Sequence, residues 1–185
     1  MQTIYPVALT PEQYVEQNYQ KRVRCPENCP NCGLANSLEV HGYYHRYLTQ
    51  SAVVAVLMIW VRRFICTVCE VTVSCLPDFA QPYRVVNTAT VQAGFDGQET
   101  NPDVWRWQGL IDAYWKRFTE HLPLLTRTVG NVFGRCPLRP SAHVFWLQLK
   151  KACGGLATAT RQLVDSLRTC LFGTYRCHQR PSVSR

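Results

Sequence analysis

The chain has 185 residues, of which 46% are hydrophobic and 17% charged, and its formal net charge at pH 7 is +8. This composition is that of a globular protein, and it excludes a wholly disordered chain. The longest apolar run, residues 52–61, is too short for a membrane-spanning helix, which needs about 20 residues. We therefore expect no membrane span, and because no basic and apolar leader is present, a cytoplasmic location.

The positive charge is concentrated in the C-terminal half of the chain. Residues 101–185 hold 13 basic and 4 acidic side chains, whereas residues 1–100 hold 7 and 8. A polyanion that binds electrostatically is therefore expected to bind mostly to the C-terminal half. The 10 cysteines, in a chain without a secretory signal, indicate metal ligands or buried thiols, because the cytosol keeps thiols reduced.

Residues 1–24 are predicted to contain an N-terminal helix. Thr10 is a candidate N-cap, Pro11 suits the first helical position, and Gln13 completes a capping box. The helix is expected to cover residues 11–22.

Residues 25–84 are predicted to form a small zinc ribbon. Residues 40–48 are rich in Tyr and His, residues 52–65 are almost all β-branched or apolar, and residues 70–75 alternate. These patterns are typical of strands. Three strands are expected to fold back over two pairs of cysteines.

Residues 85–172 are predicted to form a small α-helical module. Three helices are expected, at residues 101–121, 141–152 and 156–172. Their apolar residues recur at helical spacing, and Gly154 and Gly155 separate the last two. The module is expected to contain a helix-turn-helix-like pair, and residues 173–185 to form a flexible tail. The expected fold class is therefore α+β, a three-stranded zinc ribbon followed by this helical module.

Two C-x2-C motifs, here called knuckles, carry the chemistry. The first holds Cys29 and Cys32, and the second holds Cys66 and Cys69. Each knuckle can donate two thiolates to one tetrahedral Zn²⁺, and Gly33 suits the turn after the second ligand. Because four thiolates leave no open position for water, the motif predicts one structural zinc ion and no catalysis at the metal.

The choice of ligands has alternatives. Cys25 also lies at ligand spacing from Cys29 and could replace a knuckle cysteine, and His41 or His45 could replace a thiolate. The other thiols without a partner at ligand spacing are interpreted as buried: Cys75, Cys136, Cys153 and Cys170.

The knuckles belong to a longer pattern. It consists of Cys29, Pro30, Cys32 and Gly33, then His41, Gly42 and Tyr43, Arg46 and Tyr47, Val61 to Phe64, Cys66 and Cys69, and finally Leu76, Pro77, Phe79, Pro82 and Tyr83. This pattern resembles the zinc ribbons that head insertion-sequence transposases. It is more similar to an uncharacterised bacterial family, associated with mobile elements, in which such a ribbon precedes a short helical region. In that family Gly usually follows the last ligand, whereas this chain has Glu70.

The resemblance implies association with mobile-element DNA, without strand transfer. A transposase of the RNase H type needs three spaced carboxylates that hold two divalent metals. The few acidic residues after the ribbon do not suggest such a set, and the remaining chain is short for that catalytic fold. We therefore expect a DNA-binding protein that is not an enzyme.

Basic residues of both parts are the candidate DNA contacts. They are Arg62, Arg63, Arg106, Lys150, Lys151, Arg161 and Arg168. Two alternatives remain open. The protein could be a zinc-stabilised adaptor that docks a transposase or another partner through the aromatic helix of residues 104–118, or it could be an inactive transposase remnant.

Overall fold

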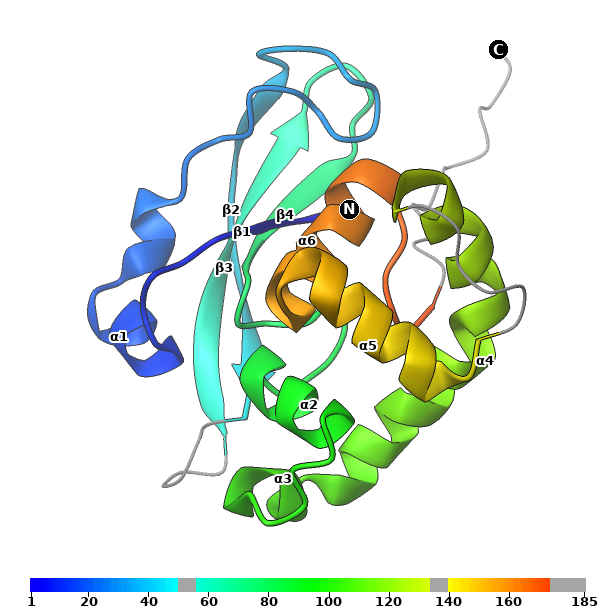
Figure 1. Ribbon diagram of the computed structural model, residues 1–185. Helices are drawn as coiled ribbons and strands as arrows, with labels where there is room; N and C mark the ends of the chain where they lie inside the picture. Colours follow the sequence, from blue (N-terminus) through cyan, green and yellow to red (C-terminus); the bar gives the residue numbers. More distant parts are fainter. Residues whose placement is uncertain (50–55, 134–139, 174–185) are drawn as a thin grey trace.

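The computed structural model describes residues 1–49, 56–133 and 140–173. It is an α+β structure, as the sequence predicts, with one β-sheet and helices on both sides of it (Figure 1). Within the described ranges, no helix is both long and apolar enough to cross a membrane.

The sheet has four strands, so the prediction of a three-stranded ribbon is wrong. The strands are β1 (Gln2–Tyr5), β2 (Leu38–Leu48), β3 (Leu57–Cys66) and β4 (Thr72–Pro77), in the spatial order β1-β4-β3-β2. Neighbours β2 and β3, and β3 and β4, are antiparallel, and β1 pairs in parallel with β4. The first four residues of the predicted strand 52–65 lie outside the described residues.

Strand β1 was missed because its signal is short and its pairing is distant. It has four residues, and Gln2 pairs with Ser74 far along the chain. The N-terminal amino group also donates to the carbonyl of Thr72 at 2.6 Å. The strand is therefore fixed by tertiary contacts that a local pattern does not contain.

The N-terminal helix begins as predicted and ends early. Helix α1 (Pro11–Glu16) has the expected capping box, in which Thr10 accepts from the N–H of Gln13 and Gln13 accepts from the N–H of Thr10. Asn18 then adopts a left-handed backbone with φ of 50°, and the 3-10 helix η1 (Tyr19–Arg22) follows. Because a left-handed residue cannot continue an α-helix, the predicted helix of residues 11–22 is two shorter elements.

The helical part is more divided than predicted, and its longest helix extends further along the chain. Its elements are α2 (Thr88–Phe95), α3 (Pro102–Arg106), α4 (Gln108–Phe133), α5 (Ala142–Cys153) and α6 (Leu156–Leu167). The helix predicted to end near residue 121 breaks at Trp107 and then continues past Pro123. Buried Leu122, Leu125 and Val129 extend the apolar stripe, so packing there offsets the cost of the internal proline.

The sheet and the helices share buried surface. A large core cluster lies among α2 to α6, and a second cluster joins Ile4, Ile59 and Leu76 of the sheet to Val164 of α6. Helix α6 contacts β1, and α5 joins α6 through Gly154 and Gly155. Helix α6 therefore packs against both the sheet and the other helices. The helix-turn-helix-like pair stays a prediction.

Candidate metal centre

Four cysteines form a candidate metal centre at one end of the sheet. The sulfur atoms of Cys29, Cys32, Cys66 and Cys69 all lie within 4.8 Å of one another. Cys66 is the last residue of β3, and Cys69 stands in the turn that leads to β4. In the described part of the chain no other group of three or more His, Cys, Asp or Glu residues has a metal-binding arrangement.

The two knuckles have the same backbone hydrogen bonds. The N–H of Gly33 donates to the carbonyl of Cys29 at 2.7 Å, and the N–H of Glu70 donates to the carbonyl of Cys66 at 2.9 Å. The N–H groups of the two cysteines in turn donate to Leu34 and Val71, at 2.9 and 3.1 Å. Two segments far apart in the sequence thus form equivalent turns, each presenting two sulfur atoms on the same side.

Both turns need a left-handed residue after the second cysteine. Gly33 has φ of 77° and Glu70 has φ of 56°. Glycine adopts this conformation at little cost, whereas a residue with a Cβ atom is strained there by about 1 kcal/mol. The second knuckle therefore carries strain that the first does not.

The sulfur spacing fits a tetrahedral metal ion and not a disulfide. The Sγ atoms of Cys29 and Cys69 are 3.7 Å apart, and so are those of Cys32 and Cys66. Four sulfurs placed 2.3 Å from a zinc ion at tetrahedral angles are about 3.8 Å apart. A disulfide would need about 2.05 Å.

Ser37 and Thr67 connect the knuckles, and sequence spacing did not identify either residue. The N–H of Thr67 donates to the carbonyl of Ser37 at 2.8 Å. The hydroxyl of buried Ser37 lies 3.4 Å from the sulfur of Cys66. A serine before a strand is too common to be recognised from the sequence, so only the tertiary structure shows this support.

The metal-free thiols differ in acidity. The hydrogen bond from the N–H of Cys69 and the contact with the Ser37 hydroxyl lower the pKa of the Cys66 thiol to about 6, whereas burial raises the pKa of the Cys29 thiol to about 12. A bound cation stabilises every thiolate that coordinates it. The thiol of Cys66 therefore ionises more readily than a free cysteine, whereas the thiol of Cys29 would ionise when it coordinates a cation.

The alternative ligands lie outside the group of four. Cys25 is exposed, and its sulfur is 3.5 Å from the carbonyl of Leu38. His41 is exposed, and His45 packs edge to face on Trp60. Cys75, Cys153 and Cys170 are buried, as predicted for thiols without a ligand partner, while Cys136 lies outside the described residues.

The two candidate DNA contacts of the sheet, Arg62 and Arg63, lie on opposite faces of β3. The guanidinium of Arg62 lies over the rings of Tyr43 and Phe64, and that of Arg63 lies over Tyr44. Consecutive strand residues point to opposite faces. One flat ligand on the sheet can therefore contact only one of these arginines.

The helical candidates are spread over three elements. Arg106, Lys151 and Arg168 are exposed. Lys150 instead forms an ion pair with Asp96, with 2.7 Å between Nζ and the carboxylate oxygen. Burial raises the pKa values of Asp78 and Asp165, and half-buried Arg161 opposes that shift for both, so its charge is partly compensated.

Fold and site together define an α+β protein with a four-cysteine candidate metal centre. A sequence model of a domain of unknown function, DUF6431, matches residues 29–106. The matched region begins at the first knuckle and includes both knuckles, β2 to β4, α2 and α3, which is less than half of the chain. No curated protein and no solved structure matches the chain.

Proposed function

We propose that the four cysteines bind one structural zinc ion and that the protein binds DNA without catalysing a reaction on it. The observation that carries the zinc proposal is the 3.7 Å spacing of sulfurs from opposite knuckles, close to the edge of a zinc-thiolate tetrahedron. Four thiolates complete the coordination of zinc, so the ion would contribute folding free energy and activate no water.

The proposal of DNA binding rests on the charge distribution. Residues 101–185 carry nine more basic than acidic side chains. Among the candidate contacts of the described helical part, Arg106, Lys151 and Arg168 are exposed and available to phosphates. Exposed Lys116, Arg117 and Arg127 of α4, which the sequence analysis did not single out, add to this positive surface.

Association with a transposable element in the cytoplasm remains part of the proposal, supported by the sequence resemblance. The non-catalytic part of the proposal concerns strand transfer of the RNase H type, which needs a carboxylate cluster that holds two metals. Two acidic residues of the helical part, Asp96 and Asp112, have other partners. Asp96 accepts from Trp146 and Lys150, and Asp112 accepts from Gln108.

A salt titration of binding to duplex DNA tests the function. The logarithm of the affinity is expected to fall with the logarithm of salt concentration, by about 0.9 for each phosphate contact. Replacing Arg106, Lys151 and Arg168 together by Gln is expected to reduce this slope. Arg161→Gln is the matched control, because Arg161 is half-buried whereas the three replaced residues are exposed. An unchanged slope in the triple variant would remove these residues from the DNA contact.

A transposase adaptor is the second candidate function, and one observation favours it. Trp105 on α3 is 77% exposed, whereas Trp107 packs against the helical core. A solvent-facing tryptophan is typical of a protein contact. If the protein binds no DNA at low salt and retains a transposase in a manner that Trp105→Ala abolishes, the adaptor function replaces DNA binding. If the protein binds neither DNA nor a transposase, the inactive transposase remnant is the interpretation that is left.

A further inference from the structure

The face of the sheet that carries α1 also exposes a row of aromatic side chains. In the register of β2 and β3, Tyr47 pairs with Met58, His45 with Trp60, and Tyr43 with Arg62. The exposed fractions are 56% for Tyr47, 43% for Met58, and 40% for both Trp60 and Tyr43. We call the following five residues the aromatic ladder: Tyr43, His45, Tyr47, Met58 and Trp60.

Contacts within the ladder hold its rings in place. The ring of His45 packs edge to face on Trp60, with centroids 5.7 Å apart, and on Tyr47, with centroids 6.0 Å apart. The guanidinium of Arg62 lies 5.4 Å from the centroid of Tyr43 and donates to its hydroxyl at 2.8 Å. Ordered rings lose little conformational entropy when a ligand stacks on them.

The surroundings of the ladder are positively charged. Of the three arginines in residues 40–69, Arg62 lies on the face of the ladder, whereas Arg46 and Arg63 lie on the opposite face. Arg62 also donates to the carbonyl of Lys21 at 3.1 Å, which brings the exposed side chains Lys21, Arg22 and Arg24 to the border of the ladder. Helix α1 on this face contributes two carboxylates, Glu12 and Glu16, so the basic side chains Lys21, Arg22, Arg24 and Arg62 outnumber the acidic ones. An aromatic surface with an excess of basic residues suits a ligand that combines flat rings with negative charge.

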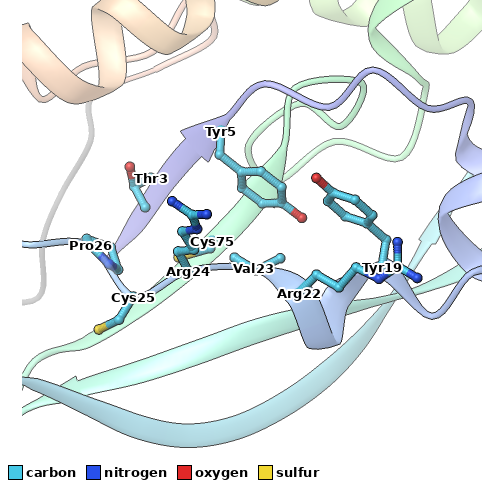
Figure 2. A pocket seen from close by; sticks show the side chains of 9 residues that line it. All are labelled: Thr3, Tyr5, Tyr19, Arg22, Val23, Arg24, Cys25, Pro26 and Cys75. Atoms are coloured by element: carbon cyan, nitrogen blue, oxygen red, sulfur yellow. The ribbon is translucent and has the colours of Figure 1, made fainter.

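A pocket of about 520 Å³ lies beside β1, lined by other residues than those of the ladder. Figure 2 shows its lining side chains, which include Arg22, Arg24 and the rings of Tyr5 and Tyr19, and none of them is acidic. Thr3 pairs with Cys75, Cys75 with Arg62, and Arg62 with Tyr43. Directly paired residues point to the same face of a sheet, so the pocket and the ladder lie on one face.

We propose that this face binds single-stranded DNA, with bases stacked on the aromatic ladder and phosphates held by Arg22, Arg24 and Arg62. This inference rests on the proposed DNA binding and names the form of DNA that the sheet recognises. Successive side chains on one face of a strand are about 6.8 Å apart. Bases in a duplex strand rise by about 3.4 Å. The ladder therefore suits bases that have left the duplex stack.

The charge of this face favours DNA over a protein ligand. Arg22, Arg24 and Arg62 beside the ladder give it a local positive charge that complements a polyanion. Every base has an aromatic face that can stack on a ring, and every phosphate can pair with an arginine. The following test also identifies the case in which the ladder binds a protein and not DNA.

The test measures fluorescence anisotropy with a labelled single-stranded oligothymidine and with a duplex of the same length, using the full chain. Trp60→Ala and Tyr47→Ala are each expected to weaken single-strand binding about tenfold, the loss of one stacked base, and to leave duplex binding unchanged. Trp105→Ala is the matched control, since Trp105 is exposed at 77% on α3, outside the ladder, and is expected to change neither affinity.

Each outcome has a distinct consequence. If neither form of DNA binds the wild-type protein, the proposed function fails and this inference fails with it. If duplex binds normally and the ladder variants keep wild-type affinity for the single strand, only the inference is overturned. Equal losses in Trp60→Ala and Trp105→Ala also overturn it, because the effect would then not be specific to the ladder. If the ladder binds a protein instead, Trp60→Ala loses self-association or partner binding and keeps its DNA affinity, which overturns the inference.

Discussion

Two regions of the molecule are stabilised in different ways. The helical side consists of α2 to α6, and the knuckle end consists of the two cysteine knuckles and the residues packed beside them. Among the described residues, the helical core cluster contains 19 buried side chains, whereas the cluster beside the cysteines contains Val23, Phe64 and Cys75. At about 25 cal/mol per Å² of buried apolar surface, a cluster of three side chains contributes little against the entropy of ordering the chain. The knuckle end therefore depends on metal ligation, and the helical side depends on packing.

Metal removal is the largest perturbation of this contrast. Structural zinc in small domains contributes about 10–16 kcal/mol of apparent binding free energy. A strong chelator is expected to abolish the protection of backbone amides from hydrogen exchange in residues 27–37 and 66–71, and to leave protection in α4 and α6 largely intact. Exposed Cys32 gives the chelator access to the site. Equal loss of protection in both regions would show that the two are one cooperative unit.

The reverse perturbation removes packing on the helical side. Leu163 of α6 is fully buried in the helical core. Leu163→Ala is expected to lower the free energy of unfolding by about 2–5 kcal/mol, the cost of lost burial and a residual cavity. Urea denaturation measures the change, and metal analysis of the same sample is expected to give the wild-type zinc content. A loss of zinc in this variant would contradict the separation of the two regions.

A smaller effect is expected where α2 is tied to α5. Asp96 accepts from the indole N–H of Trp146 at 2.9 Å and from Lys150 at 2.7 Å. Asp96→Ala leaves the indole N–H of buried Trp146 without its partner, which is expected to cost about 1–3 kcal/mol in thermal or urea unfolding. Asp112→Ala is the control, since exposed Asp112 accepts only from Gln108 in the described contacts and is expected to change stability by less than about 0.5 kcal/mol.

The smallest effect compares the two knuckles directly. Glu70→Gly is expected to stabilise the protein by up to about 1 kcal/mol, because glycine relieves the left-handed strain. Gly33→Ala is expected to destabilise it by a similar amount, and since a Cβ atom at Gly33 would meet nothing within 4 Å, the cost is that of the backbone alone. Urea denaturation of the two zinc-loaded variants measures both changes in the free energy of unfolding. A destabilised Glu70→Gly variant would show that the Glu70 side chain makes a contact that outweighs its strain.

The sequence predicted the cysteine cluster well because the signal is local. Two residues between ligands fix the turn that presents both sulfurs, so each knuckle can be recognised from a few residues. The capping box at Thr10 and the helix stop at Gly154 are predictable for the same reason.

Features that depend on distant contacts could not be predicted in this way. Helix α2 was missed because half of its buried residues are polar, Thr88 and Thr90 beside Val91 and Phe95, so it shows no apolar stripe. The sequence predicts Lys150 as a DNA contact and does not reveal its ion-pair partner Asp96, which is 54 residues away. The aromatic ladder likewise emerges only when the register of β2 and β3 brings its members together.

The central claim is that one zinc ion holds the knuckle end, and its most direct test is the metal content of the protein purified without added metal. The account predicts about one zinc per chain in the wild type and in Cys75→Ala and Cys25→Ser, and none in Cys66→Ser. Cys75 and Cys25 lie outside the group of four, so these variants control for the loss of a thiol alone. Wild-type protein that is fully folded at both ends and contains no metal would contradict the claim.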